Sequence, residues 1–158
     1  MINSFLKGKI SQNFPHDPTP DQRFALESIA DFLLATTPDS LLLLKGYAGT
    51  GKTSLIGALV KTLHELGQKT MLLAPTGRAA KVFSNYAGQK AYTIHKRIYR
   101  QKAFSNEPVG FLPAPNFYKD TIFIVDEASM ITNDGVDSYI FGSGRLLDDL
   151  FIRERTAG

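Results

Sequence analysis

A glycine-rich stretch with one lysine and one threonine carries the clearest chemistry in the sequence. Residues 46–53 read GYAGTGKT and fit the spacing G-x-x-x-x-G-K-[ST]. Glycines allow positive φ angles and let an anion approach backbone N–H groups closely. In such a loop the lysine contacts the β- and γ-phosphates, and the final hydroxyl is a ligand of Mg²⁺. The spacing predicts a phosphate-binding loop for ATP with Mg²⁺, and the alternative is an ordinary turn between a strand and a helix.

The elements on either side fit a phosphate loop. The apolar run LLLLK at 41–45 predicts a central strand, since it is far shorter than the about 20 residues that cross a bilayer. Apolar residues at helical spacing then predict a helix that ends at Gly67. The predicted nucleotide contacts are Gly46, Tyr47, Ala48, Gly49, Thr50, Gly51, Lys52, Thr53 and Ser54.

A second candidate site lies at the end of a later apolar run. Residues 121–127, TIFIVDE, predict a buried strand that closes on Asp126 and Glu127. In open α/β sheets, ligands bind beyond the carboxyl ends of the strands, so these carboxylates are expected to face the phosphate loop. Asp126 would hold Mg²⁺ opposite Thr53, and Glu127 would orient and deprotonate the attacking water. The alternative is that two acidic residues merely mark the end of a strand.

The remaining segments predict an α/β fold. Helices are expected at 19–35 and 77–86, a buried strand at 69–75, and a short helix in the sequence TIHKRIY. Strands that alternate with helices predict a parallel sheet with helices on both faces. Residues 101–120 contain three prolines and no sustained period, which predicts an irregular excursion or a hairpin.

Composition narrows the class of protein. A chain of 158 residues that is 43% hydrophobic can form one domain with a core. The net charge of +3 is compatible with nucleic acid without requiring it. The absence of cysteine excludes disulfides and thiolate metal sites. Neither a signal peptide nor a membrane span is evident, so we expect a cytoplasmic protein with no membrane contact.

Four segments together resemble a known family. GYAGTGKT, LLAPTGRAAKVF, TIHKRIY and FIVDEASMI are similar to motifs I, Ia, Ib and II of superfamily 1 DNA helicases, in the RecD/Dda-like 5′-to-3′ branch. The resemblance runs from residue 19 to about 132, in the family's order, and TPDQRFALESI resembles its Q-motif. It implies a RecA-like P-loop NTPase that couples ATP hydrolysis to movement on single-stranded DNA. The first motor lobe would be 19–158, with 1–18 as an N-terminal extension and 101–120 as an insertion.

The resemblance implies further contacts. Gln22 would hydrogen-bond adenine, although it also suits a capping box with Thr19. In motif Ib, Lys96, Arg97 and Arg100 would add charge beside the DNA. The alternatives are a helix start with solvated basic residues for motif Ia, and a helix cap for the motif Ib histidine. The implied single-stranded DNA contacts are Pro75, Thr76, Arg78, Lys81, Thr93 and His95.

The insertion at 101–120 falls where such helicases carry a small strand-separating hairpin. Its aromatic residues could stack on bases or wedge a duplex. The interpretation we favour is that they attach the loop to the surface of the domain. These aromatic residues are Phe104, Phe111, Phe117 and Tyr118.

The sequence continues only briefly after motif II. A family member would go on to a second lobe with an arginine for the γ-phosphate, so we expect an incomplete single lobe that binds ATP, hydrolyses it slowly and does not unwind DNA. Two other classes remain open. One is a small-molecule or nucleoside kinase with the same loop, and the other is a non-catalytic, nucleotide-responsive module that binds DNA or a protein.

Overall fold

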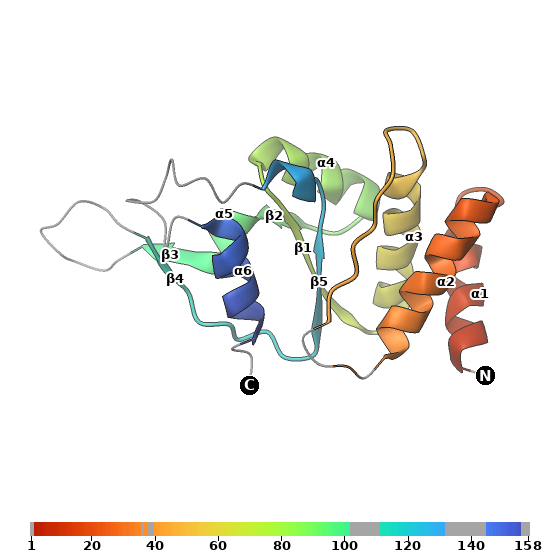
Figure 1. The fold of residues 1–158 in the computed structure, drawn as a ribbon, viewed down its shortest axis with the longest axis horizontal. Helices are drawn as coiled ribbons and strands as arrows, with labels where there is room; N and C mark the ends of the chain where they lie inside the picture. Colours follow the sequence, from red (N-terminus) through yellow and green to blue (C-terminus); the bar gives the residue numbers. More distant parts are fainter. Residues whose placement is uncertain (1, 36, 38–39, 102–110, 132–144, 156–158) are drawn as a thin grey trace, which may run out of the picture. The chain divides into compact units, whose positions relative to one another are not determined.

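The structure is a computed structural model that describes residues 2–35, 37, 40–101, 111–131 and 145–155. It divides into two compact units, and each is described by itself. Figure 1 labels the helices and strands of both. The first unit contains Met1–Lys69 and Tyr86–Gly88, and the second contains Thr70–Asn85 and Gln89–Gly158. Among the described residues, no helix has the length and apolar content that crossing a bilayer would require.

The first unit consists of three helices. They are α1 (Ile2–Asn13), α2 (Pro20–Leu34) and α3 (Lys52–Glu65), and α1 packs against both of the others. Leu6 and Ile10, one helical turn apart, are buried from α1, and the side chain of Asn13 donates to Thr62 Oγ1 at 3.0 Å. This helix lies within the predicted extension 1–18, for which no helix was expected.

The start of α2 confirms the predicted capping box. The Thr19 hydroxyl accepts from the Gln22 backbone N–H at 3.3 Å, and the Thr19 N–H donates to Gln22 Oε1 at 3.0 Å. Pro20 occupies the first helical position, where its missing N–H costs no hydrogen bond. The capping box therefore places Gln22 in the first turn of α2.

The second unit contains a parallel three-stranded sheet flanked by helices, as predicted. Its strands are β1 (Lys69–Ala74), β2 (Ala91–Thr93) and β5 (Thr121–Val125), in the order β2-β1-β5. Ala74 pairs with Thr93, and the N–H of Asp126 donates to Leu73 O at 3.0 Å. The carboxyl ends of the three strands therefore lie at one edge of the sheet.

The other elements of the second unit connect or cover these strands. They are α4 (Gly77–Ala87), α5 (Ile94–Ile98), the 3₁₀ helix η1 (Ala128–Met130) and α6 (Leu146–Arg155). A hairpin is formed by β3 (Tyr99–Gln101) and β4 (Phe111–Pro113), which pair antiparallel. This confirms the hairpin alternative for the segment 101–120.

Two of the aromatic side chains of the insertion pack against the core of the second unit. Phe111 and Tyr118 are partly buried against the central cluster, which confirms for these two residues that they attach the insertion to the domain. Phe117 is 82% exposed, and Phe104 lies outside the described residues. The buried cluster itself consists of Met71, Leu73, Ile94, Ile98, Tyr99 and Leu150.

The prediction of a central strand at 41–45 is wrong. These residues carry no strand, and Leu41 and Leu43 are 69% and 60% exposed. An apolar run becomes a strand only when neighbours accept and donate its backbone hydrogen bonds. Within the described ranges no strand pairs with this segment.

The strand β5 also differs from its prediction. It lies at an edge of the described sheet and is only partly buried at every position, whereas the sequence predicted a strand covered on both faces.

Candidate nucleotide and DNA sites

The loop before α3 has the backbone conformation that the glycine spacing predicted. Gly49 has φ +78° and Gly51 has φ +86°, in a region that other residues rarely adopt. Gly51 caps α3, so the helix begins at Lys52. The first N–H groups of a helix lack partners within the helix and attract anions, and here they follow directly after the loop.

The side chain of Lys52 folds back over this loop. Its ammonium donates to Gly46 O at 2.5 Å and to Tyr47 O at 2.7 Å. The hydroxyl of Thr50 also donates to Tyr47 O, at 2.8 Å. The lysine therefore presents its charge at the loop backbone, where phosphate oxygens would compete with two carbonyl oxygens for the same ammonium.

Gln22 takes part in the loop as well as in the helix cap. Its Nε2 donates to Thr50 O at 3.0 Å, while its Oε1 accepts from Thr19 N–H. Of the two sequence interpretations, the capping box is confirmed, and contact with adenine remains a prediction. The structure thus brings Gln22 and the phosphate loop together within the first unit.

The acidic pair of motif II lies at the end of β5. Asp126 is fixed there by its N–H bond to Leu73 O of the neighbouring strand. Glu127 is exposed and has φ +53° and ψ +38°, a left-handed conformation that is unfavourable for a residue with a side chain. Such strain is found most often at functional sites. The conformation directs the chain away from the sheet at the point where the two carboxylates occur.

The strain at Glu127 allows a stability prediction. We expect Glu127→Gly to raise the free energy of unfolding by about 1 kcal/mol, because glycine adopts positive φ without steric cost. Urea unfolding of wild type and variant measures the difference. Glu127→Ala, which keeps a Cβ, is the control and should not gain this stability. Equal stability of the glycine and alanine variants would contradict a left-handed Glu127.

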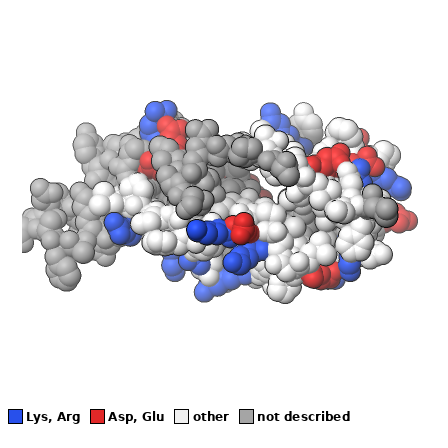
Figure 2. Space-filling model, turned by 90° about the horizontal axis from the view of Figure 1, so that it is seen from below, with Lys and Arg blue, Asp and Glu red and all other residues white. Residues whose placement is uncertain are grey.

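Motif Ia follows β1 and opens α4. Thr76 accepts from Ala79 N–H at 3.1 Å and so caps the helix, while Arg78 and Lys81 are exposed. Pro75 is partly buried at the strand end. Separately from these two residues, Figure 2 shows Lys and Arg side chains gathered in the lower middle of one face of the molecule, with acidic side chains beside them. Motif Ia therefore does form the start of a helix, as the alternative interpretation holds. Arg78 and Lys81 are also exposed and can contact phosphate groups.

Motif Ib follows β2 in the same way. Thr93 caps α5 by accepting from Lys96 N–H at 3.2 Å, so the alternative that His95 is the cap is wrong. The centre of the His95 ring lies 5.7 Å from the centre of the Tyr99 ring. Because Thr93 pairs with Ala74 at the end of β1, motifs Ia and Ib begin side by side at the carboxyl edge of the sheet. Tyr92 of β2 was not among the predicted residues; it lies partly buried against the core of the second unit, and a single tyrosine in the sequence gives no signal of this.

A phosphate loop that opens a helix, together with a parallel sheet whose strand ends carry the acidic pair, defines a RecA-like P-loop NTPase fold. A family model described as an AAA domain matches residues 19–140, and the chain belongs to this family.

Two curated relatives extend the comparison. The chain is 35% identical over 92 residues, 58% of its length, to the ATP-dependent RecD2 DNA helicase of Deinococcus radiodurans. It is 36% identical over 90 residues, 55% of its length, to the ATP-dependent DNA helicase dda of Enterobacteria phage T4. The matched segments span 12% and 20% of these two proteins. The resemblance to the RecD/Dda-like branch of superfamily 1 is confirmed.

Proposed function

We propose that this chain is the ATP-binding lobe of an ATP-dependent DNA helicase, in which hydrolysis drives movement along single-stranded DNA. The observation that carries the proposal is the loop before α3, where two glycines have positive φ and the Lys52 ammonium lies against the loop carbonyls, an arrangement that suits a phosphate group. Both relatives are named as ATP-dependent DNA helicases, which supports the proposal. We assign the lobe to 19–158, with 1–18 as an N-terminal extension and 101–120 as an insertion.

The chain supplies groups for each part of the hydrolysis. The loop backbone and Lys52 would bind the phosphates, and Gln22 would add a contact to adenine. Thr53 and Asp126 carry the oxygen ligands that Mg²⁺ prefers, and a bound Mg²⁺ would neutralise phosphate charge. Glu127, exposed at the strand end, would take a proton from the attacking water. We further propose a cytoplasmic location, in keeping with DNA as the substrate.

The proposed DNA track lies along the carboxyl edge of the sheet. Thr76 lies just after β1 and Thr93 ends the adjacent strand β2, and their hydroxyls can contact phosphate groups from the starts of α4 and α5. Backbone contacts of this kind hold a single strand with little base preference. Pro75 and His95 would complete the track, with Arg78 and Lys81 as its cations.

We expect the Arg78→Ala/Lys81→Ala double variant to bind a labelled oligothymidylate less tightly and with a weaker dependence on salt. Each lost phosphate contact on a single strand lowers the slope of log affinity against log salt by about 0.7. Fluorescence anisotropy over a range of NaCl concentrations measures the slope. Lys7→Ala/Lys61→Ala removes the same charge from α1 and α3 and should leave the slope nearly unchanged. An unaltered slope in the motif Ia variant would mean that this segment is only a helix start.

Phosphate release from ATP, with and without single-stranded DNA, separates the proposed function from the two alternatives. A helicase lobe should release phosphate faster when DNA is present. A small-molecule kinase would transfer phosphate to an acceptor at a rate that is independent of DNA, and a non-catalytic module would bind ATP without turnover. DNA-independent turnover would overturn the proposal.

A further inference from the structure

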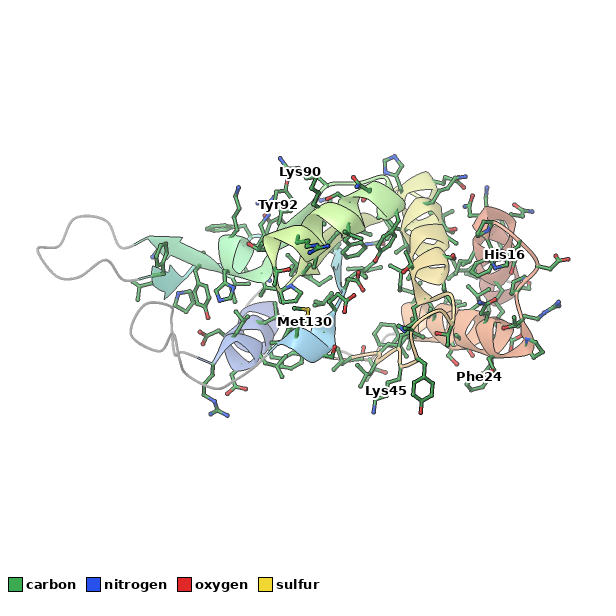
Figure 3. All side chains as sticks on the ribbon, turned by 90° about the horizontal axis from the view of Figure 1, so that it is seen from above. His16, Phe24, Lys45, Lys90, Tyr92 and Met130 are labelled. Carbon is green, nitrogen blue, oxygen red and sulfur yellow. The ribbon has the colours of Figure 1, made fainter. Side chains whose placement is uncertain are left out.

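Arg97 of α5 makes two contacts inside the second unit that its position in a basic motif does not predict. Its guanidinium carbon lies 3.6 Å from the centre of the Tyr92 ring, and its Nη1 donates to the Tyr118 hydroxyl at 3.1 Å. The Nζ of Lys90, labelled with Tyr92 in Figure 3, lies 5.4 Å from the centre of the same Tyr92 ring. Arg97 is half-buried, whereas its neighbours Lys96 and Arg100 are exposed.

These contacts join three segments. Tyr92 belongs to β2, Arg97 to the helix of motif Ib, and Tyr118 to the chain that returns from β4 towards β5. The Tyr118 ring meets Phe123 of β5 edge-on at 6.0 Å between centroids, which fixes the acceptor that Arg97 uses. A planar guanidinium can stack on one ring and donate in its own plane to a second group, which an ammonium cannot do in the same geometry.

The base of the hairpin of β3 and β4 lies next to α5. Its first strand starts at Tyr99, directly after α5, and the N–H of Ala114, directly after β4, donates to Ile98 O at 2.7 Å. On the first strand, the buried Tyr99 hydroxyl donates to Asp149 of α6 at 2.6 Å. Burial and this hydrogen bond raise the pKa of Tyr99 well above its usual range. The first strand is thus attached through Tyr99, and the returning chain through Tyr118.

We propose that Arg97 is a positioning residue that fixes the returning chain of the β3–β4 hairpin to the helix of motif Ib, and that it is not a DNA phosphate contact. The idea that the hairpin acts on DNA rests on the proposed function, but the attachment itself does not. Because α5 and the hairpin are joined in this way, a shift of the motif Ib helix moves the hairpin base with it. Lys96 of α5 and Arg100 of β3 are exposed and can contact phosphate groups.

Hydrogen exchange of the whole chain tests the attachment. We expect backbone amides of β3 and β4 to exchange about tenfold faster in Arg97→Lys and in Arg97→Gln than in wild type, because both lose the stack and the directed hydrogen bond. Tyr118→Phe, which removes only the acceptor, should give a smaller increase. Lys96→Ala should match wild type, and amides of the buried strand β1 should be unchanged in every variant, which shows that the core of the second unit is intact. If β3 and β4 exchanged in Arg97→Lys at the wild-type rate, the proposal would be overturned, because a positive charge without the guanidinium would then be sufficient to hold the hairpin.

Binding to oligothymidylate tests the second half of the proposal. The salt slope of log affinity should be unchanged in Arg97→Gln and lower by about 0.7 in Lys96→Ala. The preference for a forked duplex over the single strand should fall severalfold in Arg97→Lys and stay constant in Lys96→Ala. A lowered slope in Arg97→Gln would make Arg97 a phosphate contact and overturn the proposal. If wild type bound no DNA, the proposed function would fail, while the exchange result would still decide whether Arg97 holds the hairpin.

Discussion

Replacing Glu127 by glutamine is expected to slow DNA-stimulated phosphate release by about 10² to 10⁴-fold, the usual contribution of a general base. Glutamine has nearly the shape of glutamate but cannot take a proton from water. The side chain is exposed at the end of β5, and the substitution leaves the loop backbone and Lys52 unaltered, so nucleotide affinity should stay close to that of wild type. Steady-state phosphate release at saturating ATP and oligonucleotide measures the rate, and calorimetric titration measures the affinity.

The control for this variant is Glu27→Gln, which neutralises an exposed carboxylate on α2. It should leave both turnover and affinity unchanged. If Glu127→Gln released phosphate as fast as wild type, the assignment of Glu127 as the base would be wrong. A loss of affinity in place of a loss of rate would give it a binding role.

Gly51→Ala is expected to have the second large effect, this time on both stability and binding. The φ of +86° is strained for alanine, and an added Cβ would lie only 2.4 Å from Gln22 Nε2. The left-handed strain and the loss of the bond from Gln22 to Thr50 should together lower the free energy of unfolding by about 2 to 3 kcal/mol. The displaced loop should also bind nucleotide at least about tenfold more weakly, since it loses charge-assisted hydrogen bonds to phosphate.

Gly8→Ala provides the matched control for Gly51→Ala. Gly8 lies within α1, and nothing is within 4 Å of an added Cβ there. Alanine should stabilise this helix by about 0.5 to 1 kcal/mol and leave nucleotide binding unchanged. Urea unfolding and titration of both variants make the comparison. Wild-type stability and affinity in Gly51→Ala would contradict the loop conformation described above.

The parts of the fold that could be predicted from the sequence are those that depend on nearby residues. The capping box needs only Thr19 and Gln22, three positions apart, and it formed as expected. The helix after the phosphate loop and the buried strand at 69–75 also follow from local spacing and from a short apolar run. Gly51 has the positive φ that the loop pattern required.

Distant partners decided the parts that were not predicted. The apolar run 41–45 had the composition of a strand, but pairing depends on neighbouring strands, and none in the described ranges pairs with it. The helix α1 depends on α2 and α3 to bury Ile10. The strand β2 has only three residues, too few for a periodic signal.

Among the candidate site residues, a positive charge did not predict whether the side chain is exposed or packed against other residues. Arg78, Lys96 and Arg97 looked alike in the sequence, as basic residues in two motifs. The structure leaves the first two exposed and places Arg97 between Tyr92 and Tyr118. These tyrosines are 5 residues before and 21 residues after the arginine, so only the folded chain brings them together.

The central claim is that the loop at residues 46–53 binds ATP, and calorimetric titration with a non-hydrolysable ATP analogue and Mg²⁺ tests it most directly. The account predicts one nucleotide per chain for wild type, and an affinity about 10- to 100-fold lower for Lys52→Ala, because an ionic hydrogen bond to phosphate is lost. Lys61→Ala, which removes an exposed lysine from the same helix, should bind as wild type does. Equal affinity of wild type and Lys52→Ala, or no binding by wild type, would contradict the account.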